Sequence, residues 1–435
     1  MSRLSLLLLT FGITTASAGD NWPHWRGPTA NGIAPADANP PTRWDEITNI
    51  KWKVELAGRG SATPIVWGEQ IFVVSAAKTD REAKADEIPK PDPRFEVKTK
   101  PPSHFYRFEV QSFNRADGKL LWRKTATEAV PHEGHHNTHN YAAGSPTTDG
   151  KRLYVSFGSF GIYAYDLAGN LLWKRDLGRM HTRYAWGEAV TPVVHGNTLL
   201  INWDQEADSR LIALNAETGE TRWEAKRDEK TSWNTPAVVE HRGRTLAILN
   251  GTNRARAYDM AEGKVVWEVG GMTTNAIPSP LVAEGVAYIT SGYGRGIVVA
   301  VPLDATGDLG KDGAVKWRSD KSGPYVPSPL LLGDRLYLTL ANVNVLTILD
   351  AKTGAVVLDA MRLTNLGTLY GSPMAAAGRI YLSDREGTTV VLKAGDKPTV
   401  LAANKLDDAL DASPVALGKT LYLRGVKYLY AIEEK

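Results

Sequence analysis

Residues 191–223 read TPVVHGNTLLINWDQEADSRLIALNAETGETRW and contain one complete structural unit. Short apolar runs alternate here with turns, and the glycines of two turns, Gly196 and Gly219, supply the positive φ that tight turns need. The pattern predicts three strands and the beginning of a fourth, at residues 191–194, 198–202, 211–215 and 221–223. Such a unit would form a single small antiparallel sheet.

The start of this unit, a Ser or Thr directly before a Pro, occurs eight times. The pairs are Thr63-Pro64, Ser145-Pro146, Thr191-Pro192, Thr235-Pro236, Ser279-Pro280, Ser328-Pro329, Ser372-Pro373 and Ser413-Pro414. Successive prolines lie 41–49 residues apart, except that the first two are 82 apart. A period in the forties with four strands per repeat is typical of a β-propeller, so the sequence predicts eight blades around one axis.

A second recurring feature is a turn that contains Gly and is followed a few residues later by Trp. It occurs before Trp122, Trp173, Trp223 and Trp267 and, enlarged over residues 304–313, before Trp317. A large flat ring on an outer strand can fill the gap between two blades. We therefore interpret these tryptophans as packing residues.

The two ends of the repeat region complement each other. The last repeat, residues 413–432, lacks a fourth strand, whereas residues 49–54 have the pattern of a fourth strand with no partners before them. We expect this N-terminal strand to complete the last blade, because shared closure removes two free sheet edges. The predicted fold is an all-β, eight-bladed propeller of four-stranded antiparallel blades, closed by the N-terminal strand.

Two segments interrupt the repeat. Residues 77–104 are rich in Lys, Arg, acids and Pro, which predicts a polar, mobile insertion in the first blade. Residues 20–48 contain Trp22, Trp25 and Trp44, and we expect this lead-in to pack across the propeller, because three exposed tryptophans would be costly.

The first eighteen residues resemble an export signal. Arg3 is followed by an apolar run and by the small residues 16–18, which predicts cleavage after Ala18 and a single propeller domain over residues 19–435. The alternative is a membrane anchor, but the apolar run is too short to span a bilayer. No second long apolar run follows it. The chain has no cysteine, so it has neither disulfides nor a cysteine for lipid attachment. We expect a periplasmic or secreted protein without a membrane span.

The net charge excludes one class of partner. The whole chain of 435 residues carries a formal charge of +3. Nucleic-acid-binding proteins usually have a strong basic surplus on one face. We therefore expect no nucleic-acid partner.

The repeats resemble a known family. Residues 215–223 and 259–267 look like the pyrroloquinoline-quinone (PQQ) repeat, and residues 22–28, 58–68 and 323–329 resemble exported PQQ-like propeller proteins. The propeller of the outer-membrane β-barrel assembly lipoprotein has similar blades. The resemblance implies blade structure and does not imply a bound quinone.

The resemblance also suggests a dehydrogenase as the alternative function. The family's dehydrogenases often stack PQQ on a disulfide of adjacent cysteines, which this chain lacks, and use Ca²⁺ with a catalytic Asp. Glu188, Asp204, Asp384 and Asp411 are loop acids that could face the axis, but none carries a motif that maps onto the family. We expect no cofactor, with PQQ and Ca²⁺ as the alternative, and assign no catalytic residue.

Loops that enter the innermost strands, and loops between second and third strands, share one face of a propeller. Guanidinium groups there suit carboxylate or phosphate oxygens, and aromatic rings suit a flat or sugar-like ligand. The alternative is that these residues are ordinary solvated loop residues, some paired with acids. The candidates for a ligand-binding funnel are Arg59, His139, Tyr141, Arg183, Trp186, Trp233, Arg254, Arg295, Tyr325, Tyr370, Arg385 and Arg424.

Two further clusters could hold metal. His132, His135, His136 and His139 lie close in sequence, but Pro131 and Gly134 oppose the helix that a zinc-protease motif requires. We interpret them as a hydrogen-bonded loop, with Zn²⁺ or Cu²⁺ as the alternative. Asp304, Asp308 and Asp312 are spaced too widely for a Ca²⁺ loop, which indicates a solvated turn.

These observations favour a non-catalytic, monomeric binding propeller over an enzyme. Its partner would be an extracytoplasmic protein or a small anionic or sugar-like ligand. An enzyme would be a PQQ-dependent alcohol or sugar dehydrogenase or a carbohydrate-active protein, and a third possibility is an assembly scaffold that engages extended peptides along blade edges.

Overall fold

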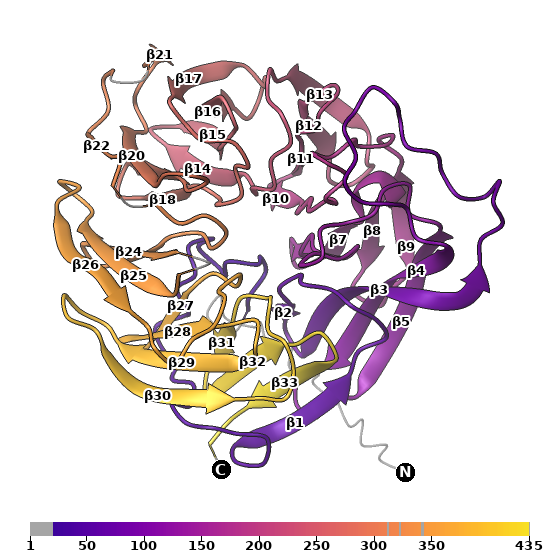
Figure 1. The fold of residues 1–435 in the computed structure, drawn as a ribbon, viewed down its shortest axis with the longest axis horizontal. Helices are drawn as coiled ribbons and strands as arrows, with labels where there is room; N and C mark the ends of the chain where they lie inside the picture. The colour runs from indigo at the N-terminus through magenta and orange to yellow at the C-terminus, as the bar shows by residue number, and fades with distance from the viewer. Residues whose placement is uncertain (1–20, 311–312, 322, 341–342, 435) are drawn as a thin grey trace, which may run out of the picture.

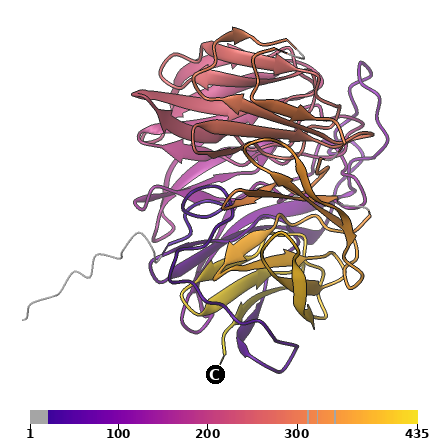
Figure 2. The ribbon, with the colours of Figure 1, turned by 90° about the vertical axis from the view of Figure 1, so that its left-hand side faces the viewer.

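The computed structural model describes residues 21–310, 313–321, 323–340 and 343–434. The expected leader, residues 1–18, lies outside these residues. Eight sheets surround one axis (Figure 1) and form a thick disc when seen from the side (Figure 2). The prediction of an eight-bladed propeller is confirmed.

The first four blades follow one another along the chain, and each begins at the axis. Blade 1 contains β2 (Ile65–Trp67), β3 (Gln70–Glu82), β4 (His104–Asn114) and β5 (Leu120–Ala129). Blade 2 contains β6 (Thr147–Thr148), β7 (Arg152–Ser156), β8 (Ile162–Asp166) and β9 (Leu171–Arg175), with the short 3₁₀ helix η2 (Gly158–Phe160). Blade 3 contains β10 (Val193–His195), β11 (Thr198–Trp203), β12 (Arg210–Asn215) and β13 (Thr221–Lys226). Blade 4 contains β14 (Ala237–His241), β15 (Arg244–Leu249), β16 (Arg254–Asp259) and β17 (Val265–Gly270).

The last four blades continue the ring. Blade 5 contains β18 (Leu281–Ala283), β19 (Val286–Ser291), β20 (Ile297–Pro302) and β22 (Trp317–Ser319). Blade 6 contains β23 (Leu330–Leu332), β24 (Arg335–Leu340), β25 (Val345–Asp350) and β26 (Val356–Arg362). Blade 7 contains β27 (Met374–Ala376), β28 (Arg379–Ser383), β29 (Thr388–Lys393) and β30 (Thr399–Lys405). Blade 8 contains β31 (Val415–Leu417), β32 (Thr420–Arg424), β33 (Tyr428–Ile432) and, as its outer strand, β1 (Ile50–Glu55).

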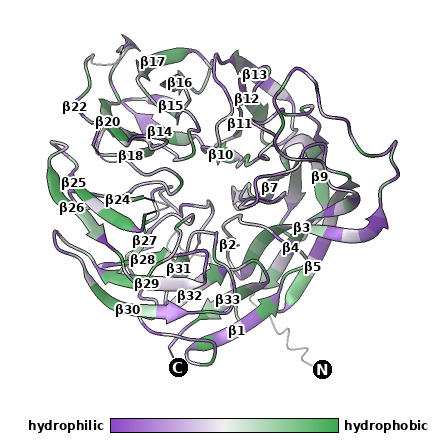
Figure 3. Ribbon diagram, in the orientation of Figure 1, coloured by the Kyte–Doolittle hydropathy of each residue, from purple (hydrophilic) through white to green (hydrophobic). Residues whose placement is uncertain are grey.

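Closure of the ring occurs as expected. Strand β1 pairs antiparallel with β33, and Trp52 lies opposite Ala431 while Lys53 lies opposite Tyr430. Every residue of β19, a second strand, is buried, whereas the outer strand β13 alternates between exposed and half-buried residues. Inner and outer strands also differ in hydropathy. In Figure 3 many strands are coloured as hydrophobic, whereas β1, at the rim, is largely hydrophilic.

The outer-strand tryptophans join neighbouring blades. Trp173 donates its indole N–H to the carbonyl oxygen of Ala216, 3.1 Å away in the turn of the next blade. A Cβ on Gly219 of that turn would come within 2.8 Å of the Trp173 ring, so the turn needs glycine. The packing role is confirmed. Equivalent bonds, of 2.9–3.2 Å, join Trp52 to Arg115, Trp122 to Leu167, Trp223 to Met260 and Trp317 to Ala351.

The enlarged turn of blade 5 is exposed at Asp304 and Asp308, as expected for a solvated turn, but it also makes contacts that the sequence did not predict; Asp312 lies outside the described residues. Its short strand β21 (Gly307–Asp308) pairs in parallel with β17 and gives blade 4 a fifth strand. Asp308 also lies 2.9 Å from a guanidinium nitrogen of Arg254. The turn therefore adheres to the neighbouring blade, and Trp267 beneath it is fully buried.

The lead-in packs across the propeller, as predicted. Trp22 forms an isolated bridge with Val66 of blade 1, and Ile33 forms one with Ala375 of blade 7. The buried guanidinium of Arg26 donates to carbonyl oxygens at the inner edges of blades 6 and 7. The lead-in thus runs under the inner strands of several blades, and Figure 1 shows its indigo trace inside the ring.

The insertion differs from the mobile segment that we expected. Strands β3 and β4 extend into it, up to Glu82 and from His104. Phe95 stacks on His181 with ring centroids 4.7 Å apart, and the backbone N–H of Lys98 donates to the carbonyl oxygen of Tyr184 at 3.0 Å. The insertion is therefore anchored on the loop that enters blade 3.

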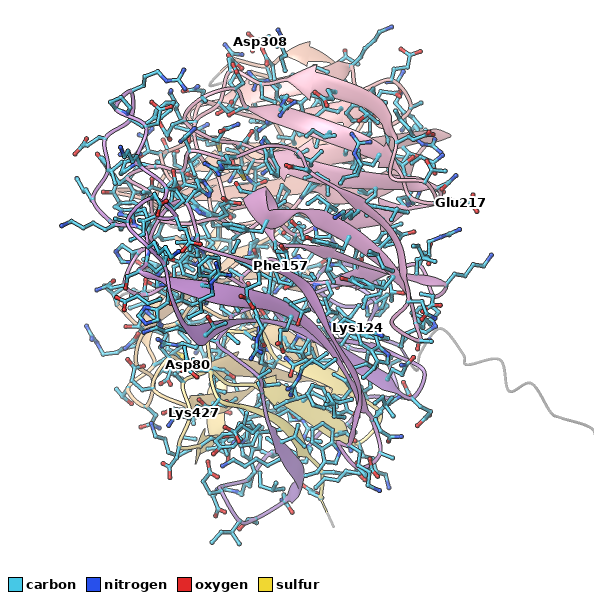
Figure 4. The ribbon with its side chains drawn as sticks, turned by 90° about the vertical axis from the view of Figure 1, so that its right-hand side faces the viewer. Asp80, Lys124, Phe157, Glu217, Asp308 and Lys427 are labelled. Atoms are coloured by element: carbon cyan, nitrogen blue, oxygen red, sulfur yellow. The ribbon has the colours of Figure 1, made fainter. Side chains whose placement is uncertain are left out.

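The two faces of the disc are built from different connections. Asp80 in blade 1 and Lys427 between β32 and β33 lie toward one side in Figure 4, whereas Glu217 in an outer turn projects toward the other. We call the first side, which carries the insertion, the loop face. Among the described residues, no helix is long and apolar enough to cross a bilayer.

Candidate functional site

The residues before the eight prolines form a ring of hydroxyl groups at the axis. Each proline opens an innermost edge strand, where a missing N–H costs no ladder bond. Among the described residues, seven backbone N–H groups donate to the hydroxyl oxygen of the next blade at 2.8–3.1 Å. These bonds run from Thr63 to Ser145, Ser145 to Thr191, Thr235 to Ser279, Ser279 to Ser328, Ser328 to Ser372, Ser372 to Ser413 and Ser413 to Thr63.

This hydroxyl ring lines a cavity of about 440 Å³ on the axis. Trp25 of the lead-in also lines the cavity, and we take it as the floor because its neighbour Arg26 binds the carbonyl oxygens of Pro329 and Pro373, on the far side of the ring from the loops. Asp411 contributes the single carboxylate of the described lining, which contains no Lys or Arg. Rings from several blades form the wall: His136, His139, Trp186, Trp233, Tyr293, Tyr325 and Tyr370.

The wall is held in place by contacts between loops. Trp233 donates its indole N–H to the carbonyl oxygen of Gly187 at 2.8 Å. Trp186 packs edge-on against Tyr184 and His136, with ring centroids 5.0 and 5.4 Å apart. These rings are therefore fixed before any ligand arrives.

Residues 132–141, which we call the histidine loop, lie over one side of the cavity. The hydroxyl of Tyr370 donates to the Thr138 hydroxyl at 3.2 Å, and Arg385 donates to the Thr138 carbonyl oxygen at 3.2 Å. Tyr370 and Arg385 belong to blade 7, whereas the loop leads into blade 2. The loop thus bridges blades that are not adjacent.

The cavity lining is close to neutral. Arg385 binds both carboxylate oxygens of Asp411, at 2.6 and 3.1 Å. Burial lowers the pKa of His139 to about 4, so its imidazole is uncharged at neutral pH. Burial also lowers the pKa of His136.

Five of the twelve funnel candidates line the cavity, namely His139, Trp186, Trp233, Tyr325 and Tyr370. Arg385 lies directly behind it, paired with Asp411. The sequence-based interpretation missed the hydroxyl ring, although the repeated Ser/Thr-Pro pairs were its signal. It also missed Trp25 and Tyr293.

Contrary to the prediction, the candidate arginines do not gather in the lining of the axial cavity. Arg254 pairs with Glu268 and Asp308, at 2.8 and 2.9 Å, away from the cavity lining. Arg424 is buried and donates to the carbonyl oxygens of Ala62 and Val74, at 2.8 and 2.7 Å.

The other four candidates also lie outside the lining. The Arg59 backbone bridges to Ala76, and the Tyr141 hydroxyl donates to the Glu133 carbonyl oxygen at 3.3 Å. Arg183 lies over the Tyr184 ring, 5.1 Å from its centroid, and Arg295 is exposed.

A buried acidic cluster lies between the insertion and the histidine loop. Glu188 accepts bonds from the backbone N–H and hydroxyl of Ser159, at 2.7 and 2.6 Å, and burial raises its pKa to about 8. Burial likewise raises the pKa of Glu133 to about 7, while it lowers the pKa of His132 to about 4. Within the described ranges, no three His, Asp or Glu side chains gather in a group that could hold a metal ion.

The comparisons with known proteins agree with this architecture. The sequence matches the family model described as outer membrane protein assembly factor BamB over residues 107–358 and 243–435. No curated protein matches the sequence.

Three solved structures illustrate the structural likeness. BamB from Moraxella catarrhalis is 14% identical, with a TM-score of 0.53, and the match covers 82% of this chain and 98% of that one. A europium-containing methanol dehydrogenase is 12% identical, with a TM-score of 0.62 and coverage of 94% and 90%. The computationally designed Ika8 protein is 10% identical, with a TM-score of 0.53 and coverage of 87% and 99%. At these identities the likeness concerns the fold alone.

Proposed function

Because this chain belongs to the family of PQQ-like propellers described as outer membrane protein assembly factor BamB, we propose that it is a non-catalytic binding propeller. Its ligand would enter the axial cavity from the loop face. The observation that carries this proposal is the cavity itself, which is about 440 Å³, walled by fixed aromatic rings and lined by the hydroxyl ring. Concave sites of this size with a few placed polar groups are typical of small-molecule binding.

The alternative is a PQQ-dependent dehydrogenase. PQQ is a flat quinone with several carboxylate groups, and a buried carboxylate needs a cation or strong donors to replace its water. The described lining offers no Lys or Arg, and its single carboxylate is already bound to Arg385. These residues do not fit the quinone, and this favours binding over redox chemistry.

Both functions can be tested on the purified protein. We expect no dye reduction when PQQ, Ca²⁺ and an artificial electron acceptor are added with simple alcohols or sugars; dye reduction would overturn the non-catalytic proposal. Ligand binding is followed by tryptophan fluorescence in the unchanged protein and in Trp186→Ala. If no small ligand binds, while an envelope protein binds the unchanged protein and Trp186→Ala equally, the protein is an assembly scaffold instead.

We also propose that the protein acts outside the cytoplasm as a monomer, in the periplasm or after secretion. The apolar run near the N-terminus and the small residues that end at Ala18 support export. Cell fractionation with N-terminal sequencing should find a mature chain that begins at Gly19. A cytoplasmic chain that retains Met1 would contradict the proposal.

A further inference from the structure

We infer that the axial cavity binds a neutral saccharide, with a sugar ring against its aromatic wall. This inference rests on the proposed binding function and specifies the ligand class. It replaces the anionic ligand that the arginine-rich loops led us to consider.

The aromatic wall suits the apolar face of a sugar ring. Trp186, Trp233, Tyr325 and Tyr370 come from different loops and all line the same cavity. The C–H groups of a pyranose face pack well on the electron-rich face of an aromatic ring. Because Trp233 is held by Gly187, and Trp186 by two edge contacts, little freedom is lost on binding.

The polar groups of the cavity suit the sugar hydroxyls. Each hydroxyl oxygen that accepts a backbone N–H in the hydroxyl ring keeps its own proton as a donor. Asp411 keeps acceptor capacity beyond its two bonds to Arg385. Sugar hydroxyls both donate and accept, so they can satisfy both kinds of group.

The described lining of the cavity offers no cation to an anionic ligand. Arg254 and Arg385 are paired with acids, Arg424 is bound to backbone carbonyls, and Arg59, Arg183 and Arg295 lie outside the lining. A carboxylate or phosphate in the cavity would lose its water and meet no unpaired cation within the described lining. A neutral ligand incurs no such cost.

The test is titration calorimetry of the mature protein with neutral sugars and their charged counterparts. The neutral set is glucose, galactose, mannose, N-acetylglucosamine and two glucose disaccharides; glucuronic acid and glucose 6-phosphate are the charged set. We expect at least one neutral sugar to bind, and both charged sugars to bind at least about tenfold more weakly than that neutral sugar. Equal or tighter binding of the charged sugars, or no binding of any neutral sugar at about 10 mM, would overturn the inference.

Two variants locate the site. Trp186→Ala should weaken sugar binding by at least about tenfold. Tyr293→Ala, which changes a 44% exposed ring of the wall and should fold normally, should also weaken it. The matched control is Tyr428→Ala, a half-buried aromatic of blade 8 that lies outside the lining. Unchanged binding in Tyr293→Ala and Trp186→Ala would place the sugar elsewhere and refute the inference.

A third probe separates the two proposals. Indole is flat and aromatic but has no hydroxyl groups. If indole binds and loses affinity in Trp186→Ala while no sugar binds, the cavity is a small-molecule site and only the saccharide inference fails. If neither indole nor any sugar binds, the proposed small-ligand function fails as well.

Discussion

At the scale of single residues, the Ser or Thr before seven of the eight prolines connects two blades through a hydrogen bond among the described residues. Its hydroxyl oxygen accepts a buried backbone N–H from the preceding blade, so one side chain satisfies a polar group that the inner edge of a sheet would otherwise leave unpaired. The proline that follows cannot donate and needs no partner. The dipeptide therefore marks the axis of the propeller.

Ser328→Ala tests this role. The substitution leaves the backbone N–H of Ser279 without its acceptor, 3.0 Å away, in a buried position. We expect a loss of about 1–3 kcal/mol in the free energy of unfolding, measured by denaturant titration. The matched control, Ser103→Ala, changes an exposed serine and should alter stability little. Equal stability of the two variants would refute the role.

The sequence predicted the aromatic part of the site better than its charged part. Trp186 and Tyr325 line the cavity because loops that enter inner strands must approach the axis. The ion-pair partner of an arginine depends instead on which acid the fold brings close to it from another part of the chain. Arg254 finds Asp308 in the turn of another blade, a pairing created by β21, which the repeat pattern does not contain.

At the scale of elements, strand β1 holds the ring closed. It covers the edge of β33, and its Trp52 packs against Tyr422, with ring centroids 6.1 Å apart, and bonds to Arg115 of blade 1. An uncovered edge would expose unpaired backbone groups. The incomplete last repeat made this closure predictable.

Trp52→Ala should cost about 3–5 kcal/mol of stability, since it removes a buried indole at the seam between blades 8 and 1. Limited proteolysis should then cut first near residues 45–55. Lys53→Ala on the same strand is the control, because the partly exposed Lys53 makes a surface ion pair with Glu46 and a contact with the Tyr428 ring, which contribute less than a buried indole. A smaller loss for Trp52→Ala than for Lys53→Ala would contradict the role of β1.

The insertion supports the loop that presents Trp186. Its anchoring could not be predicted from composition, because the contacts of Phe95 and Lys98 are made with residues far along the chain, His181 and Tyr184. A polar sequence is compatible with either a free or a docked segment.

Replacing residues 84–100 by a short Gly-Ser linker should leave the blades intact but loosen residues 181–188. Hydrogen exchange of the amides in that loop should become faster, since the loop loses the bond from the Lys98 N–H to the Tyr184 carbonyl oxygen and the stacking of Phe95 on His181. The amides of β19, in a distant blade, serve as the control. Unchanged exchange in residues 181–188 would show that the insertion does not support this loop.

At the scale of the whole molecule, the buried acids and histidines make stability depend on pH. Burial raises the pKa of Glu188 from 4.5 to about 8, so the folded chain binds more protons than the unfolded chain between these values. The free energy of unfolding contributed by Glu188 therefore falls as pH rises through this range. His132 and His139 act in the opposite sense, because their pKa values are lowered from 6.5 to about 4, and their contribution is lost as pH falls below 6.5.

Glu188→Gln separates these effects. Above about pH 7.5 the two histidines are almost fully deprotonated in both the folded and the unfolded chain, so they no longer make the free energy of unfolding depend on pH. The melting temperature of the unchanged protein should therefore fall between about pH 7.5 and 8.5. The variant keeps an acceptor for Ser159 and should fall less over the same range. Glu217→Gln, at an exposed turn, should behave like the unchanged protein. Parallel curves for Glu188→Gln and the unchanged protein would contradict the assignment.

The hydroxyl ring also lines the axial cavity, together with Trp25. It combines three threonines, Thr63, Thr191 and Thr235, with five serines, so methyl groups crowd one part of its circumference more than the rest. Exchanging serine for threonine retains the oxygen acceptor and adds only a methyl group. Ser-to-Thr substitutions can therefore narrow the axial cavity at one blade at a time and keep the hydrogen bonds between neighbouring blades. The choice of Ser or Thr at each position thus tunes the size and shape of the ligand that can reach Trp25.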